Sequence, residues 1–462
     1  MDKTASPQSE KFIRMTTTPV EKLVCGLAAP SIAIMLISAL YNMADTYFVG
    51  SLGTSAVAAV GIAFPLMAII QAMGFFFGQG SGNYMSRALG ARETEPASRM
   101  AATGLVTGFF CMALIAVSGL VFLEPLVAGL GATPTISPYA KEYLLFILLA
   151  SPWMVAATVL NQQLRFQGSA SVAMVGMISG AALNIFLDPL FIFVFHLGIK
   201  GASAATMVSQ IVSFIILFTY GCSRQGNIAI NFRHFSPSRS RYIEMFRGGV
   251  PALLRQGLMS LSTILINHFA GVYGDAAIAA ISITNRLFMF ANSIMLGFGQ
   301  GFQPVCGFNY GAKQYGRVKK AFWFCVRVAA SGLLIIAVLM AIFAPHIIAF
   351  FRRDDPEVIR IGTVGLRLHC ITMPFAAWIV MCNMMTQTMG KAVYASVNAV
   401  SRQGLFLLPS LFFFTRFVNL GLLGIQLSLP VADIMGFILA IPIAVIVLRQ
   451  LKEAPPPSSN TP

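Results

Sequence analysis

The chain has 462 residues and a formal net charge of +15, and 57% of its residues are hydrophobic while only 10% are charged. Its mean hydropathy is +0.77. A water-soluble domain carries roughly 25% charged residues, so this composition excludes a soluble globular protein and indicates a surface that faces lipid. The positive charge alone would fit a nucleic-acid-binding protein. However, the basic residues are spread over alternate loops, which argues against a nucleic-acid partner.

Twelve apolar stretches are long enough to cross a bilayer, which takes about 20 helical residues for a hydrocarbon core of about 30 Å. We predict an all-α membrane protein with helices at 23–49, 55–85, 100–122, 138–164, 169–195, 201–222, 248–272, 276–307, 320–345, 358–388, 392–416 and 421–448. The first six form an N-lobe (23–222) and the last six a C-lobe (248–450). Three further segments complete the predicted organisation: a cytoplasmic N-terminal segment (1–22), a basic inter-lobe linker (223–247) and a disordered cytoplasmic tail (451–462).

Basic residues fix the expected orientation of these helices. With the N-terminus inside, twenty Lys and Arg residues fall in inner segments and six in outer ones. Loops on the cytoplasmic side carry an excess of Lys and Arg, so both termini are expected in the cytoplasm.

The two halves of the chain are related in sequence. The segment 30–91 aligns with 251–312 without a gap, and 16 of the 62 aligned positions are identical. The run Phe-Gly-Gln-Gly at 77–80 meets the same run at 298–301. Because each half has an even number of helices, both enter the membrane from the same side, and we predict two parallel, pseudo-symmetric lobes around a central cleft.

Ionisable residues are few in the predicted spans, where each costs several kcal/mol unless it faces a cavity or a partner. Asp45 lies in the first helix, four residues after Tyr41. In the fifth helix Asp188 follows Asn184 by four residues, so that an amide and a carboxylate share one face.

Prolines accompany both acids. Pro189 follows Asp188 directly and cannot donate a backbone hydrogen bond, and Pro30 interrupts the first helix in the same way. We therefore predict that Pro30 and Pro189 allow these two helices to bend.

Neither acid is duplicated in the second half. Ile266 stands at the position equivalent to Asp45, and Ser410 or Leu408 at that of Asp188, depending on a local gap. Symmetric scaffolding would place acids in both lobes, so the asymmetry favours a function located in the N-lobe.

The C-lobe carries other charges, namely Arg255, Arg402 and Asp433. Oppositely charged residues within membrane spans normally form ion pairs. We predict a structural or gating ion pair of Asp433 with either Arg255 or Arg402, with a second cation site as the alternative.

These features, together with Phe-Asn-Tyr-Gly-Ala-Lys at 308–313, resemble the multidrug and toxic compound extrusion (MATE) family. The run Gly-Gln-Gly-Phe-Gln-Pro at 299–304 and the pair Arg255-Gln256 are most similar to its bacterial DinF/MepA-like branch. The resemblance covers roughly residues 20 to 450. It implies a monomeric twelve-helix antiporter of the bacterial inner membrane, which exports organic cations and other amphipathic drugs in exchange for protons or sodium.

The resemblance also implies a set of cation-coupling residues in the N-lobe: Asp45, Asn184, Asp188, Thr206, Tyr143 and Asn161. The first four would also suit a bound Na⁺. The family's helix-bending proline falls on Pro30. A glutamate that the NorM-like branch uses in the seventh helix is missing here, where Arg255 lies, which weakens the case for a C-lobe sodium site.

Other functions find less support. No phosphate-binding loop, nucleophile elbow or metal-ligand spacing is present, so neither an enzyme, a cofactor nor a structural metal is expected. The nearest alternative is a flippase for a lipid-linked precursor from the same superfamily, and a channel is a more distant one. The sequence leaves open the choice between protons and sodium.

Overall fold

The computed structural model describes the chain except residues 1–6, 224–227, 229, 352–354, 419 and 452–462, and every element in the described part is helical. The N-lobe contains α2 (Val20–Gly50), α3 (Thr54–Gly90), α4 (Thr94–Val121), the short α5 (Leu123–Gly129), α6 (Ser137–Phe166), α7 (Ala170–Pro189), the π-helix η1 (Leu190–Val194) and α8 (Ile199–Cys222). A short helix, α1 (Pro7–Thr17), precedes them, and the 3₁₀ turn η2 (Phe232–His234) follows.

The C-lobe repeats this order with α9 (Arg239–Gly271), α10 (Asp275–Gly311), α11 (Tyr315–Ile342), the short α12 (Ala344–Phe351), α13 (Pro356–Thr388), α14 (Ala392–Val400), η3 (Ser401–Phe406), α15 (Leu407–Phe412), η4 (Phe413–Phe417) and α16 (Leu422–Gln450). Helix α9 thus begins inside the segment predicted as a linker. The predicted tail after residue 451 lies outside the described residues.

Eleven helices of the described part are long and apolar enough to cross a membrane. The twelfth predicted span, 392–416, coincides with the four consecutive pieces α14, η3, α15 and η4, of which two are π-helices. Wide π turns inside a membrane helix often lie at functional positions, and η3 carries Arg402.

Backbone geometry repeats between the lobes as the sequence does. Residues with positive φ in the described part fall largely into pairs: Gly53 with Gly274, Arg92 with Lys313, Gly168 with Gly390, and Gly198 with Gly421. The offset between partners is the same for the first two pairs and widens by one position at each of the last two. Since a positive φ is costly for most residues, the same sharp turns have been kept at equivalent places in both lobes.

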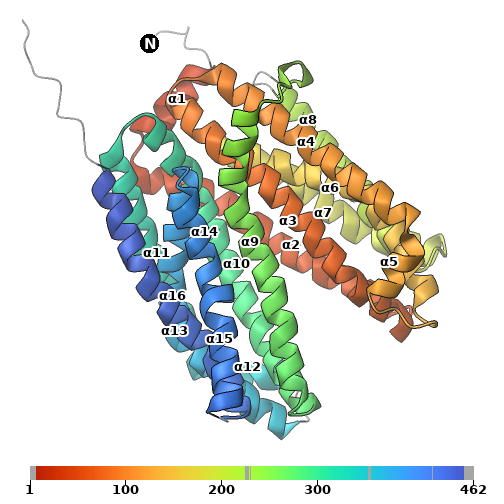
Figure 1. Ribbon diagram of the computed structural model, residues 1–462. Helices are drawn as coiled ribbons and strands as arrows, with labels where there is room; N and C mark the ends of the chain where they lie inside the picture. The colour runs from red at the N-terminus through yellow and green to blue at the C-terminus, as the bar shows by residue number, and fades with distance from the viewer. Residues whose placement is uncertain (1–6, 224–227, 229, 352–354, 419, 452–462) are drawn as a thin grey trace, which may run out of the picture.

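The lobes meet at one end and spread apart toward the other (Figure 1). We call the end that holds α1 the closed end, and the end that holds α5 and α12 the open end. At the closed end, a Cβ on Gly90 would lie 2.1 Å from the Phe308 carbonyl oxygen, and one on Gly311 would lie 2.0 Å from that of Arg87. The matched glycines therefore let α3 and α10 touch backbone to backbone.

Polar contacts reinforce the closed end. Gln387 donates to the Gln79 side chain at 2.9 Å, and Arg165 donates to that of Gln300. Gln79 and Gln300 are the two glutamines of the repeated Gly-Gln-Gly, so each lobe receives an equivalent hydrogen bond from the other. The conspicuous sequence motif is thus explained by inter-lobe packing.

Candidate functional site

Two helices of the N-lobe bring a carboxylate, an amide and a hydroxyl together toward the open end. Asp188 and Asn184 lie in the last turns of α7, and Thr206 lies near the start of α8. The Asn184 amide nitrogen is 3.2 Å from Asp188 Oδ1 and 3.4 Å from Thr206 Oγ1. All three side chains are buried, and Asp188 is 0% exposed.

Helix α2, which packs against α7, adds the second acid. Asp45 lies close enough to Asp188 to act on it electrostatically, and both carboxylates act in the same way on the hydroxyls of Tyr41 and Tyr143. We call these six residues the N-lobe cluster: Tyr41, Asp45, Tyr143, Asn184, Asp188 and Thr206. Five of the six predicted cation-coupling residues thus lie together, and Asn161 is the exception. Tyr41 was not in the predicted set but belongs to the cluster.

Several oxygens of the cluster are left for a ligand. Asp45 Oδ1, Asn184 Oδ1 and Asp188 Oδ2 are buried and have no hydrogen-bond partner among the described residues. Buried acceptors without a donor are costly, and two carboxylates near each other add repulsion. A proton or a small cation relieves both penalties, so these oxygens fit a site that binds a cation reversibly.

Asn161 is the exception. Its amide donates to the carbonyl of Ala173 at 3.2 Å, near the start of α7. Asp188 follows Ala173 by fifteen residues, which is about 22 Å along a helix. The repeat explains this role, since Asn383 makes the same bond to the carbonyl of Ala395 in the C-lobe at 2.7 Å. Asn161 therefore holds the end of α6 to the start of α7, and the structure does not bring it together with the other predicted residues.

The C-lobe counterpart of the cluster is apolar. The π-helices η1 and η4 occupy matching places in the repeat, as do α8 and α16, and aligning their first residues makes Leu411 the equivalent of Asp188, instead of the predicted Ser410 or Leu408. The extra offset comes from the π turns of η3, which lengthen this helix relative to its N-lobe partner. The counterparts of Asp45, Asn184, Asp188 and Thr206 are Ile266, Leu407, Leu411 and Leu429, which pack together in one buried hydrophobic cluster.

The charges of the C-lobe pair among themselves. The Arg402 Nε donates to Asp433 Oδ1, and Thr372 Oγ1 donates to Asp433 Oδ2 at 3.1 Å. Arg255 instead donates to Asn383 Oδ1 at 3.2 Å. Of the two predicted alternatives, the structure pairs Asp433 with Arg402. Both oxygens of Asp433 are used, which leaves no free carboxylate oxygen for a cation there.

The two prolines differ in their local effect. Pro189 is the last residue of α7, and the backbone continues from it as the π-helix η1. Pro30 lies inside α2, which remains one helix. Near Pro30, α2 approaches α10 closely, because a Cβ on Gly301 would lie 2.5 Å from the Ala28 Cα. Any bend at Pro30 therefore changes a contact between the lobes.

Sequence reasoning missed one buried cation. Arg165 counts by position among the basic residues of the inner loops, yet it is 1% exposed and donates to the side chains of Gln162 and Gln300. Its counterpart in the other lobe is Gln387. The repeat was the available signal, since both residues follow the helix-clamping asparagine by four positions.

Comparison with known proteins places this architecture in a family. A family model described as MatE matches the chain twice, at residues 30–190 and 251–411. The chain belongs to the MATE family. The two matches begin at positions 30 and 251, the pair with which the repeat found from the sequence alone also begins. Membership in this transporter family makes the protein a multi-pass membrane transporter.

Similar proteins cover nearly the whole chain. The multidrug export protein MepA of Staphylococcus haemolyticus (strain JCSC1435) is 27% identical over 434 residues, which are 94% of this chain and 95% of that protein. The sequence resemblance to the MepA-like branch is thereby confirmed.

Solved MATE structures have the same fold. A MATE in complex with MaL6 superposes with a TM-score of 0.90 at 26% identity, covering 96% of this chain and 99% of that one. The outward-facing conformation of a multidrug resistance MATE transporter of the MOP superfamily gives a TM-score of 0.89, with the same identity and coverage.

Proposed function

We propose that this MATE protein is a multidrug exporter of the bacterial plasma membrane, and that it exchanges amphipathic organic cations for protons or sodium. The observation that carries the proposal is the contrast between the lobes. The N-lobe cluster gathers two acids and unpartnered oxygens, whereas Ile266, Leu407, Leu411 and Leu429 fill the equivalent place of the C-lobe. If these polar groups only held the helices together, both lobes would need them; costly groups in one lobe alone indicate a function there.

The orientation follows from the charges. The inner segments, with their excess of Lys and Arg, include the connections at the closed end, so this end and both termini face the cytoplasm. The open end then faces outward. An outward-facing MATE structure superposes over 96% of the chain, which supports the same assignment.

In the proposed cycle, the drug and the coupling ion bind in turn to the ionised carboxylates of the N-lobe cluster. With Asp45 and Asp188 ionised, a lipophilic cation is attracted to the N-lobe, where Phe and Met side chains give adaptable apolar contact. Proton or sodium entry from outside neutralises the cluster and releases the drug. The exchange is coupled because drug and ion compete for the same carboxylates.

The test uses the purified chain, as a monomer, in proteoliposomes loaded with ethidium as the transported cation. A pH gradient and a sodium gradient are imposed separately, which identifies the coupling ion. Asp188→Asn should abolish gradient-driven ethidium movement, because it removes the charge while keeping the size. Glu95→Gln is the matched control, since Glu95 is an exposed acid that forms an ion pair with Arg99 on the same helix, away from the cluster. Normal transport by the Asp188 variant would refute the proposal.

A further inference from the structure

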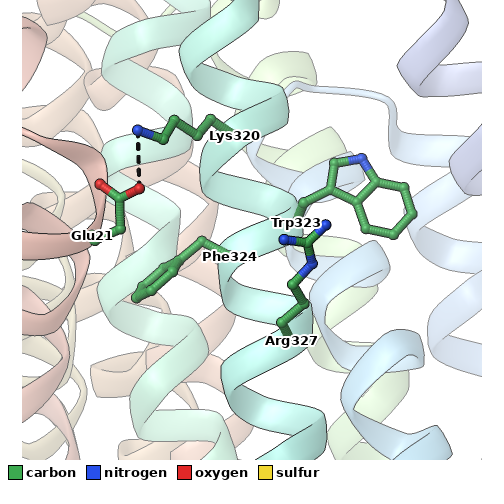
Figure 2. Close-up of a pocket in the computed structure, with 5 residues that line it drawn as sticks. All are labelled: Glu21, Lys320, Trp323, Phe324 and Arg327. Carbon is green, nitrogen blue, oxygen red and sulfur yellow. Dashed lines mark ion pairs between the residues drawn. The ribbon is translucent and has the colours of Figure 1, made fainter.

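A second, chemically different site lies on the side of the molecule near the closed end. A pocket of about 420 Å³ opens between the start of α2 and the first half of α11, and it is lined by Glu21, Lys320, Trp323, Phe324 and Arg327. Figure 2 shows that Lys320 faces Glu21, and that the Arg327 guanidinium is directed back along α11 toward Trp323. None of these residues belongs to the N-lobe cluster.

The charges in this pocket do not balance. Lys320 Nζ forms an ion pair with Glu21 at 3.0 Å. The Arg327 side chain is exposed and makes no hydrogen bond or ion pair with any residue in the described part of the chain. The pocket therefore holds two cations and one carboxylate, and that carboxylate is already paired with Lys320, so Arg327 lacks a counter-ion among the described residues.

The position of Arg327 decides where that anion comes from. Helix α11 is a membrane span, and Arg327 follows its first residue, Tyr315, by twelve positions, which is about 18 Å along the axis. A cation at this depth on a lipid-facing surface costs several kcal/mol unless its head reaches back to the interface. The direction of the guanidinium in Figure 2 is that of such a side chain.

We propose that the pocket binds the phosphodiester headgroup of an anionic phospholipid from the cytoplasmic leaflet. The Arg327 guanidinium offers a planar pair of donors that matches two phosphate oxygens, and Lys320 adds a second charge. Trp323 is 43% exposed, as expected of an indole at the membrane interface. Phe324 supplies an apolar wall for the glycerol and upper acyl chain.

The pocket also joins the lobes, because Glu21 lies in the first turn of α2 of the N-lobe and Lys320 belongs to α11 of the C-lobe. When the closed end separates during transport, Lys320 loses Glu21 as its partner. The lipid phosphate then replaces that carboxylate, so an anionic lipid lowers the cost of opening this end. The side of the membrane rests on the orientation proposed above, whereas the headgroup chemistry does not.

Binding can be measured without transport. The full chain is reconstituted with phosphatidylcholine or phosphatidylglycerol that carries bromine on the acyl chains, and quenching of tryptophan fluorescence is compared. Each basic residue contributes roughly fivefold to the local preference for an anionic lipid, so phosphatidylglycerol should quench more strongly. Trp323→Phe should remove this difference, which assigns the signal to the pocket.

Variants separate the possible outcomes. Arg327→Gln should reduce the preference for phosphatidylglycerol roughly fivefold, and Lys319→Gln, a basic neighbour on the same helix that does not line the pocket, should leave it unchanged. Lys320→Gln gives a second reading if the Arg327 variant folds poorly. Asp188→Asn should retain the lipid preference, so a failed export assay leaves this test intact. Equal quenching by both lipids, or loss of the preference on adding inorganic phosphate, would overturn the proposal.

Discussion

Ile266 and Leu411 lie in one buried apolar cluster of the C-lobe, at the places that Asp45 and Asp188 occupy in the N-lobe. The same fold therefore tolerates aliphatic side chains at these positions. The acids of the N-lobe are not required to hold the helices together, and their burial is a cost to stability.

The first prediction concerns this cost. Replacing Asn184 and Asp188 together by leucine copies the C-lobe into the N-lobe and removes two buried, incompletely satisfied polar groups. Each such group costs about 1–3 kcal/mol, so the free energy of unfolding should rise by a similar amount while export is lost. Thermal unfolding in detergent and ethidium transport measure the two effects. A less stable variant that still transports would contradict the interpretation.

The second prediction concerns the C-lobe pair. Asp433→Asn leaves the Arg402 guanidinium, whose side chain is 12% exposed, without its counter-charge. Breaking a buried pair in this way costs about 3–5 kcal/mol, whereas replacing both partners by apolar residues is often neutral. Asp433→Asn should therefore unfold at lower temperature than the double variant Arg402→Leu with Asp433→Leu. If Asp433→Asn is as stable as the wild type but fails to transport, the pair serves coupling instead of structure.

The third prediction tests the backbone contact at the closed end. A methyl group on Gly90 would meet the Phe308 carbonyl oxygen at 2.1 Å, so Gly90→Ala should force the lobes apart there at a cost of about 1–3 kcal/mol. Amide hydrogen exchange should rise at the ends of α3 and α10. Gly61→Ala, in open space on the same helix, is the control and should be neutral or stabilising by up to about 1 kcal/mol. Equal exchange in both variants would argue against the contact.

The fourth prediction concerns Arg87, which links three helices at the closed end. Its guanidinium donates to the Thr388 carbonyl oxygen at 2.7 Å and to Glu244 at 3.1 Å. Hydrogen bonds to a charged group contribute about 1.5–3 kcal/mol, so Arg87→Met should increase the population with this end open by roughly ten- to a hundredfold. Hydrogen exchange at the start of α9 reports that population.

The control for Arg87 is Arg99→Met, because Arg99 pairs with Glu95 on the exposed surface of α4 and such pairs contribute little. Unchanged exchange in the Arg87 variant would show that the glycine contacts alone hold the closed end.

Much of the fold could be read from the sequence, for two physical reasons. A bilayer requires long apolar helices, so hydropathy located the spans, and the bounds of α2 and α13 lie within a few residues of the expected ones. An acid in such a span is costly, so Asp45 and Asp188 stood out by position. The repeat was visible because closely packed glycines cannot be replaced without a clash.

Tertiary structure decided what depends on distances between helices. Asn161 and Asn184 are both polar residues of N-lobe spans, but helix packing directs Asn161 to the Ala173 carbonyl and Asn184 to Asp188. The choice of Arg402 over Arg255 as the partner of Asp433 likewise needed the crossing of α16 with η3. The sequence shows which polar residues lie in the membrane spans and therefore need partners. Only the packing of the helices brings particular groups within hydrogen-bond distance of each other.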